Sequence, residues 1–458
     1  MSALTPTPPL LSRVKRSHVL TWAMWDWGSA AFNAVMVTFV FGTFLASDTF
    51  GPDDRGTSWL AAGNAIAGVI IALTAPVIGQ RADRDGRRAL WLGVNTVLVV
   101  ATTAACFFVQ PHESYLLLGV ILLSAGNVFF EFAEVQYNAM LVDIATRSTI
   151  GRISGLGWGA GYVGGIVLLL LVYVGFIGGD THWFGITNDN AMNIRVVAVF
   201  AALWFLVFAL PIVVVMRRVE GRAERGPSQR TSIAASYRQL LRTIVNLWKY
   251  QRNTFWFFVS SAVFRDGVGA VFAYGAILGT TVYGVDPADI LFFGIGANIV
   301  AAAGAFLGGL LDDRFGPKRI IVVSLLGLIV SAAIVFVQDG TLAFWIWGLF
   351  LCFFVGPVQS SSRAFLGRLT TASAAGEMYG LYATTGRSVS FLTPALIAVF
   401  VGVSGESRMM VPAIIIVLVA GLVLLWPVKD PKVEADEPVL TDAPGHPADP
   451  TTQEPRQH

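Results

Sequence analysis

Residues 79–88, GQRADRDGRR, return 230 residues later as residues 309–318, GLLDDRFGPK. The two copies share two glycines, an aspartate, an arginine and a closing basic residue, at Gly79/Gly309, Asp83/Asp313, Arg84/Arg314, Gly86/Gly316 and Arg88/Lys318. Each copy follows the second apolar segment of its half of the chain. Self-similarity at a fixed offset is the sequence sign of a repeated architecture. The chain is therefore predicted to consist of two similar halves.

Two weaker sequence repeats support this duplication. Gly155, Leu156 and Gly161 match Gly380, Leu381 and Gly386 at an offset of 225, and DWGSAAF (26–32) matches DGVGAVF (266–272) at an offset of 240. Three sequence repeats at nearly constant offset predict that a unit of six apolar segments is duplicated along the chain.

The composition indicates a membrane protein. The chain is 55% hydrophobic and 13% charged, with a mean hydropathy of +0.66, whereas soluble domains are about 25% charged. Apolar stretches long enough to cross a bilayer recur near 19–47, 58–80, 89–110, 114–137, 154–179, 195–216, 254–283, 288–311, 319–338, 341–362, 379–403 and 409–427. The predicted fold class is an all-α polytopic membrane protein with twelve transmembrane helices in two six-helix pseudo-repeats.

The distribution of Lys and Arg predicts the orientation. Of 31 such residues, only Arg55, Arg195 and Arg408 fall at the six outward loops, and Arg265 and Arg387 lie within spans. The remaining 26 are on the other side, which is the cytoplasmic side by the positive-inside rule. Both termini are therefore expected in the cytoplasm, and the protein in the plasma (inner) membrane.

The chain divides into four predicted regions. They are a first half (1–216), a basic cytoplasmic linker (217–253), a second half (254–427) and an acidic, Pro-rich tail (428–458) without apolar period, which is expected to be disordered. The second part of the linker has apolar residues at three-to-four spacing between Arg and Lys. This pattern predicts an amphipathic helix lying on the membrane surface.

These features resemble a known family. The 79–88 signature with its degenerate second copy is similar to the cytoplasmic loop of the major facilitator superfamily. The stretches WAMWDWGSAAF (22–32), FRDGVGAVFAYGA (264–276), GRISGLGWGAGYVGG (151–165) and 356–396 resemble its vacuole-effluxer branch. The resemblance implies two halves around a central cavity and a role in moving amino acids. Gly28-Ser29 and Arg387 depart from the pattern of that branch, which puts the substrate in doubt.

Charged residues within the spans are candidates for the transport pathway, because a buried charge in a membrane helix usually faces a cavity or a partner. They are Asp26, Glu131, Glu134, Arg265, Asp266 and Arg387, joined by Gln359 and Arg363 where polar residues interrupt the segment 341–362. By the resemblance, the first, fourth, seventh and tenth segments line the cavity. Asp26 is expected opposite Arg387 or Arg265. The alternative is a set of structural ion pairs, with Glu134 the strongest candidate for a purely structural role.

The repeated signature is expected to act as a conformational latch. Gly79 allows close helix approach, Gly86 makes the turn, and Asp83 accepts hydrogen bonds from the first N–H groups of the segment 379–403, where the helix dipole favours an anion. Arg84 and Arg87 are expected to pair with carboxylates or lipid phosphates. The second copy supplies Asp313, Arg314 and Gly316. A plain basic turn is the alternative, but it explains neither the aspartate nor the glycines.

Aromatic residues near these charges are expected to line the cavity for a ligand with an apolar body. They are Trp25, Trp27, Tyr137 and Tyr274. Ordinary packing within the bundle is the alternative.

Other function classes find no support in the sequence. None of the five lysines follows a glycine, so the phosphate-binding GxxxxGK[ST] loop is absent. There is no HExxH motif or His/Cys cluster, and no cofactor, metal, nucleic acid or enzymatic activity is expected. The predicted function is secondary active efflux of a small polar or zwitterionic, amino-acid-like metabolite, coupled to protons, by a monomer in contact with lipids. A lipid or glycolipid flippase of the same fold and a non-transporting membrane sensor or scaffold remain alternatives.

Overall fold

The computed structural model describes residues 16–52, 54–178, 183–220 and 232–431. Within these ranges it contains helices and connecting segments without strands. Twelve helical segments of this described part are long and apolar enough to cross a membrane, which confirms the predicted twelve-span, all-α class. The predicted disordered tail beyond 431 and the linker residues 221–231 lie outside the described residues.

The spans follow the predicted order closely. They are α1 (Arg16–Ala30) with η2 (Ala31–Phe39) and α2 (Phe41–Leu45), α3 (Arg55–Asp85), α4 (Arg88–Ala105), α5 (Leu116–Ile144), α6 (Ile150–Val172), α7 (Met192–Glu220), α9 (Arg252–Thr281), α10 (Pro287–Phe315), α11 (Pro317–Val337), α12 (Thr341–Leu369), α13 (Ala375–Val389) with α14 (Leu392–Ser404), and α15 (Met410–Leu425).

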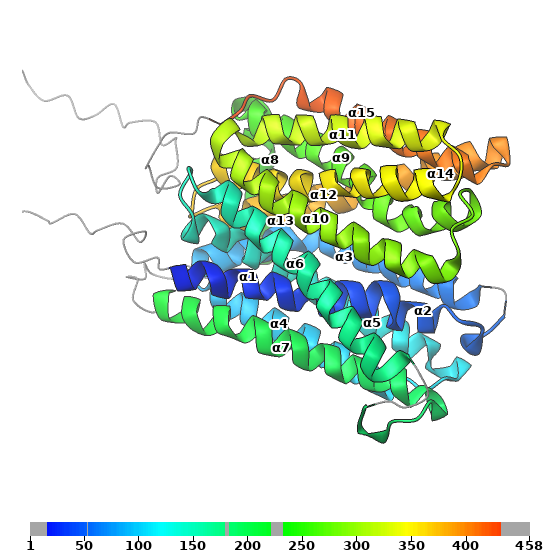
Figure 1. Cartoon of the computed structure of the whole chain (residues 1–458). Helices are drawn as coiled ribbons and strands as arrows, with labels where there is room; N and C mark the ends of the chain where they lie inside the picture. Colours follow the sequence, from blue (N-terminus) through cyan, green and yellow to red (C-terminus); the bar gives the residue numbers. More distant parts are fainter. Residues whose placement is uncertain (1–15, 53, 179–182, 221–231, 432–458) are drawn as a thin grey trace, which may run out of the picture.

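The helices form two halves that lie side by side. In Figure 1, α1 to α7 occupy the lower half of the molecule and α9 to α15 the upper half. The halves meet where α3 packs against α13 and where α6 packs against α10 and α12. Helices from equivalent positions of the two halves therefore form the interface.

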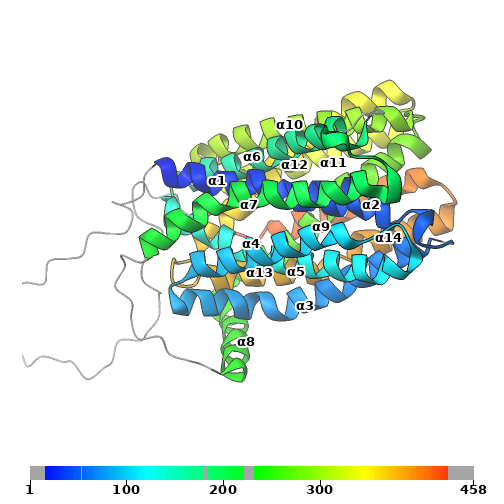
Figure 2. The ribbon, with the colours of Figure 1, turned by 90° about the horizontal axis from the view of Figure 1, so that it is seen from below.

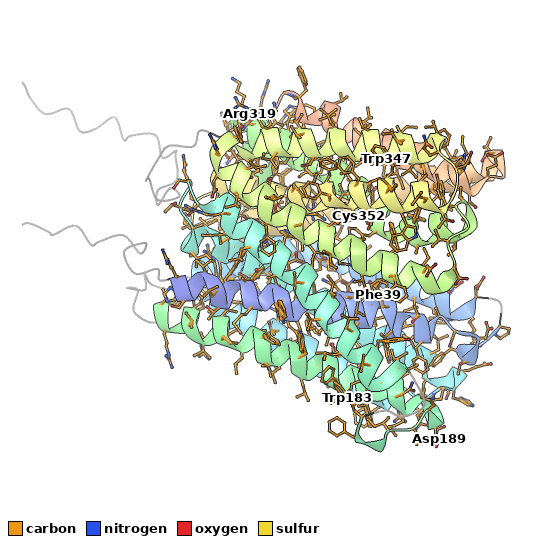
Figure 3. The ribbon with its side chains drawn as sticks, viewed as in Figure 1. Phe39, Trp183, Asp189, Arg319, Trp347 and Cys352 are labelled. Atoms are coloured by element: carbon orange, nitrogen blue, oxygen red, sulfur yellow. The ribbon has the colours of Figure 1, made fainter. Side chains whose placement is uncertain are left out.

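The two ends of the bundle are distinct. The start of α1 and the segment that follows α15 lie at the same end (Figure 1), which we call the terminal end. Arg319 lies at this end, whereas Trp183 and Asp189 lie at the opposite end (Figure 3), which we call the far end. Both described chain ends are thus on one side of the bundle.

Two spans expected to be continuous are interrupted. The first span changes from α-helix to the π-helix η2 before resuming as α2. The eleventh breaks at Ser390 and Phe391, before α14. Pro394 has no N–H and cannot continue the helical ladder, and the Thr393 N–H instead donates to Asp266 at 2.7 Å. Irregular backbone inside a membrane bundle is tolerated where protein groups satisfy it.

The predicted linker helix is α8 (Ile233–Tyr250). Ser232 begins it, since its hydroxyl accepts a hydrogen bond from the Ala235 N–H at 3.2 Å. The helix runs across the bundle axis near the terminal end and projects past α3 (Figure 2). Its direction is that of a helix lying along a membrane surface rather than crossing it.

Candidate functional site

A cavity lies between the two halves, in two adjoining parts of about 350 and 510 Å³. Gly269, Ala273 and Gln359 line both parts. The larger part extends along the first span from Trp25 and Asp26 to Thr38 and Phe39, and Phe39 lies in the far-end half of that span (Figure 3). Thirteen residues of helix rise about 20 Å, so the cavity reaches from the middle of the bundle toward the far end.

Asp26 forms an ion pair between the halves at the inner end of the cavity. Its carboxylate lies 3.2 Å from Arg363 Nη1 of α12 and accepts a hydrogen bond from the Tyr137 hydroxyl at 2.9 Å. Arg363 is buried and also donates to the Ser154 hydroxyl (2.9 Å), the Ser154 carbonyl (2.7 Å) and Asn138 Oδ1 (3.2 Å). One guanidinium thereby joins α12 to α1, α5 and α6.

This geometry corrects the expected partner of Asp26. The sequence placed Asp26 opposite Arg387 or Arg265, since Asp26 and Arg387 lie about two turns, and Arg265 about three turns, from the cytoplasmic ends expected for their helices. The depth of a residue along its helix does not tell which way its side chain points, because that depends on the rotation of the helix about its axis. Arg387 points toward α5. There it forms an ion pair with Glu131 and lies 3.5 Å from Asn127 Oδ1.

Glu134 and Arg265 are charged residues of the cavity, and neither has a charged partner in contact among the residues that the structure describes. Glu134 lines the larger part and Arg265 the smaller part. Arg265 stacks on the Tyr382 ring at 3.7 Å and donates to the Tyr382 carbonyl at 3.2 Å. Among the described residues Glu134 has no hydrogen bond or ion pair, although Asp26, Glu131, Arg265 and Arg363 are near enough to act on it electrostatically.

The remaining polar candidates divide into two groups. Gln359 lines both parts of the cavity. Asp266 also lines the cavity, but its carboxylate accepts hydrogen bonds from the N–H and hydroxyl of Thr393, at 2.7 and 2.6 Å. Asp266 therefore holds the break between α13 and α14.

The four aromatic residues expected at the cavity lie in different places. Trp25 and Tyr274 line the cavity. Trp27 faces away and packs against Trp204 and Phe208 of α7, and Tyr137 is fully buried beneath Trp25, 4.3 Å from its ring centroid. Trp27 differs from Trp25 because nearby residues of a helix point in different directions, whereas Tyr137 is covered by the Trp25 ring.

Some aromatic residues that line the cavity were not predicted from the sequence, and two of them lie on α6. Trp158 and Tyr162 of α6 line the larger part, and Tyr162 stacks on Phe272 of the other half at 6.3 Å. The signal was present, because these two rings stand four residues apart among glycines and so share a helix face.

The terminal end is closed by the repeated signature. Asp83 Oδ1 and Oδ2 accept hydrogen bonds from the N–H groups of Gly376 and Glu377 at the start of α13, both at 3.0 Å. Gly79 packs so closely on Gly376 that a Cβ at position 79 would collide with the Gly376 carbonyl oxygen. The contact between Asp83 and the helix N-terminus is the one expected from the sequence.

The second copy makes the equivalent contact across the other interface. Asp313 Oδ1 accepts from the Gly151 N–H at 2.8 Å, and Oδ2 accepts from the Arg152 N–H at 3.2 Å, at the start of α6. A Cβ on Gly309 would lie 2.7 Å from the Gly151 carbonyl oxygen. The two aspartates therefore fasten the halves together through two helix N-termini related by the repeat.

Different arginines complete the two contacts. In the first, Arg88 pairs with Asp83 and Asp143 (2.6 and 2.8 Å) and donates to the Ala372 carbonyl of the other half. In the second, Arg368 pairs with Asp312 and Asp313 and donates to the Arg147 carbonyl. Lys318, the repeat partner of Arg88, donates instead to carbonyls following α15. Arg368 was missed because the repeat assigns its role to position 318.

The other signature residues lie around these contacts. Gly86 and Gly316 have positive φ, +58° and +89°, as the turns require. Arg84 donates to Gln239 of α8, and Arg314 lies over the Phe315 ring at 5.4 Å. Arg87 begins α4.

Comparisons with known proteins agree with this architecture. A family model described as "Vacuole effluxer Atg22 like" matches residues 14–437. The uncharacterized MFS-type transporter YxiO of Bacillus subtilis is 26% identical over 410 residues, which are 88% of this chain and 93% of that protein. Autophagy-related protein 22-1 of Neosartorya fischeri is 26% identical over 309 residues, 62% of this chain. The chain spans about half (49%) of that fungal protein.

Solved structures share the fold at low identity. The proton:xylose symporter XylE, bound to 6-bromo-6-deoxy-D-glucose, superimposes with a TM-score of 0.71 at 15% identity over 94% of this chain and 99% of that one. A bacterial homologue of the iron transporter ferroportin, in an outward-facing state, gives a TM-score of 0.65 at 14% identity over 90% and 98%. With its twelve spans, its interface between two halves and its family match, the chain belongs to the vacuole effluxer Atg22-like family of major facilitator superfamily transporters.

Proposed function

We propose that this transporter exports a small zwitterionic, amino-acid-like metabolite in exchange for protons, by alternating access. The observation that carries the proposal is the pair Glu134 and Arg265, one charge from each half, both lining the cavity. Neither has an ion pair within the described residues. An amino acid brings one ammonium and one carboxylate, so it supplies a partner to each.

This assignment refines the sequence hypothesis, in which Asp26 and an arginine hold the substrate. Asp26 is engaged by Arg363 and Tyr137, and Arg387 by Glu131. A substrate ammonium or carboxylate would have to displace these partners. Glu134 and Arg265 require no such displacement, and the aromatic wall of Trp25, Trp158 and Phe272 offers an apolar surface to a side chain.

The proposed direction of transport rests on the orientation of the chain and on the end of the bundle toward which the cavity extends. The excess of Lys and Arg favours the terminal end in the cytoplasm of the plasma membrane. In that orientation the closed end faces the cytoplasm and the cavity extends toward the outside.

Proton coupling follows from competition at one carboxylate. Glu134 in its charged form binds an ammonium, whereas a proton neutralises it and removes that attraction. Since the two ligands exclude each other, a proton arriving from outside favours release of substrate to the outside. The substrate and the proton therefore move in opposite directions, and the proton gradient supplies the energy for export. This agrees with the lack of a GxxxxGK[ST] loop, which ATP-driven transport would require.

Counterflow in proteoliposomes tests the proposal. Vesicles holding the purified protein are preloaded with unlabelled amino acids, and uptake of labelled members is measured one at a time. We expect uptake of at least one amino acid. Its amide and its deaminated acid should compete at least tenfold less well, because each lacks one of the two charges.

Variants connect that activity to the site. Glu134→Gln and Arg265→Gln should each lower counterflow at least tenfold. Glu113→Gln is the matched control, since Glu113 is an exposed carboxylate outside the cavity, paired with Arg55 at 3.1 Å. Full activity of both cavity variants, or equal competition by the amide and the deaminated acid, would refute the zwitterion site.

A further inference from the structure

The linker helix α8 has an apolar face that only partly packs against the bundle. Ser236, Leu240 and Leu247 are buried where α8 meets α3 and α9. Leu241, Val245 and Trp248 are 63, 47 and 51% exposed. These three stand at positions i, i+4 and i+7 and so form one stripe along the helix.

A row of cations borders this stripe. Arg238, Arg242 and Lys249 are exposed and fall on the edge of the stripe away from the bundle, by the 3.6-residue period. Among the described residues none of the three has a salt bridge or side-chain hydrogen bond. Residues 233–250 contain no Asp or Glu. The helix therefore presents three uncompensated positive charges in a line beside an apolar stripe.

The position of α8 matches the boundary of a bilayer. The helix runs across the bundle axis and projects past α3 (Figure 2). The Tyr237 hydroxyl donates to the Leu73 carbonyl at 3.1 Å, and Gln239 accepts from Arg84. Leu73 is well inside the α3 span and Arg84 is at its end, so α8 lies about two turns in from the end of that span. A position about two turns in from the end of a spanning helix is near the boundary between the acyl chains and the headgroups of a bilayer.

We propose that α8 is a docking surface for anionic phospholipid headgroups of the membrane leaflet at the terminal end. Leu241, Val245 and Trp248 enter the acyl region, and Arg238, Arg242 and Lys249 bind the headgroup phosphates. A helix with one apolar face and a basic edge binds anionic membranes through both contributions. This surface is separate from the cavity, and it stands independently of the proposed substrate.

The test measures lipid selectivity of the full-length protein. It is reconstituted in phosphatidylcholine bilayers containing traces of spin-labelled phosphatidylglycerol or spin-labelled phosphatidylcholine, and the motionally restricted fraction of each label is compared. We expect a severalfold preference for phosphatidylglycerol that declines as salt is raised, because exposed charges are screened. Absence of any preference would overturn the proposal.

Matched variants locate the preference. Arg238→Gln with Arg242→Gln should remove most of it, whereas Arg238→Lys with Arg242→Lys should retain it. Arg217→Gln with Arg218→Gln removes the same charge from the exposed end of α7 and should leave most of the preference. Equal losses in the α8 and α7 pairs would overturn α8 as the docking surface.

Discussion

At the scale of single residues, carboxylates close together in the sequence have different roles. Glu131 and Glu134 are one turn apart on α5, yet Glu131 is paired with Arg387 and Glu134 has no ion pair within the described residues. The i, i+3 spacing predicted a shared face but not this division. The arginine that neutralises Glu131 comes from α13, 256 residues away.

Asp26 joins the two halves, and its neutralisation should stop transport. In Asp26→Asn the charged ion pair with Arg363 is lost, and the buried guanidinium keeps only neutral partners, a loss worth about 1–3 kcal/mol. We expect folded, monodisperse protein with counterflow lowered at least tenfold. Counterflow and thermal unfolding in detergent measure the two effects. Normal transport by this variant would exclude a role for Asp26.

The pair Glu131 and Arg387 should behave as a coupled unit. Side chains of Glu131 and Arg387 are 16 and 31% exposed, so solvent screens the pair in part. Glu131→Gln alone should lower stability by about 1–3 kcal/mol, and Arg387→Gln alone by a similar amount. The double variant should lose less than the sum of the two single losses, as measured by thermal unfolding. Additive losses would show that the two side chains do not interact.

At the scale of helices, two glycine contacts related by the repeat bring the halves close together at the terminal end. Gly79 touches Gly376 of α13, and Gly309 touches Gly151 and Gly155 of α6. Small residues let membrane helices approach until their backbones are in contact. The aspartates can reach the opposite helix N-termini only because the helices are this close.

A methyl group at position 79 should therefore shift the molecule away from the state closed at the terminal end. Its Cβ would collide with the Gly376 carbonyl, which is backbone and cannot move aside like a side chain. With spin labels at 108 and 403, exposed far-end positions in opposite halves, Gly79→Ala should shorten the mean interlabel distance. Gly68→Ala, on the same helix with nothing within 4 Å of its Cβ, is the control. Identical distance distributions in both variants would contradict this account.

At the scale of the whole molecule, exchange predicts how a pH gradient acts. In the proposed exchange, protons from outside compete with the substrate for Glu134 and favour its release, so a more acidic exterior should accelerate efflux from preloaded right-side-out vesicles. Glu134→Gln should transport more slowly and lose the response to the gradient, because its amide cannot take up the proton. The measurement is initial efflux rate against external pH. Faster efflux at alkaline external pH would indicate the opposite coupling.

The repeat made part of the closed end predictable. Asp83 caps the N-terminus of α13 as expected, because a signature loop and a helix start are both visible in the sequence. The pairing of Arg368 with Asp313 could not be predicted from the repeat. The repeat aligns Arg88 with Lys318, but a guanidinium at the end of α12 lies nearer to Asp313 in the folded chain.

The sequence by itself determined the twelve spans, their duplication, the amphipathic helix and the charged residues that had to be accounted for. Hydropathy, period and offset are properties of neighbouring residues, and a bilayer allows few structures other than helices. Only the tertiary structure decided that Asp26 pairs with Arg363, that Trp27 and Tyr137 lie outside the cavity, and that Glu134 and Arg265 line it. Those outcomes depend on the rotation of each helix about its own axis, which is set by packing between helices that are hundreds of residues apart.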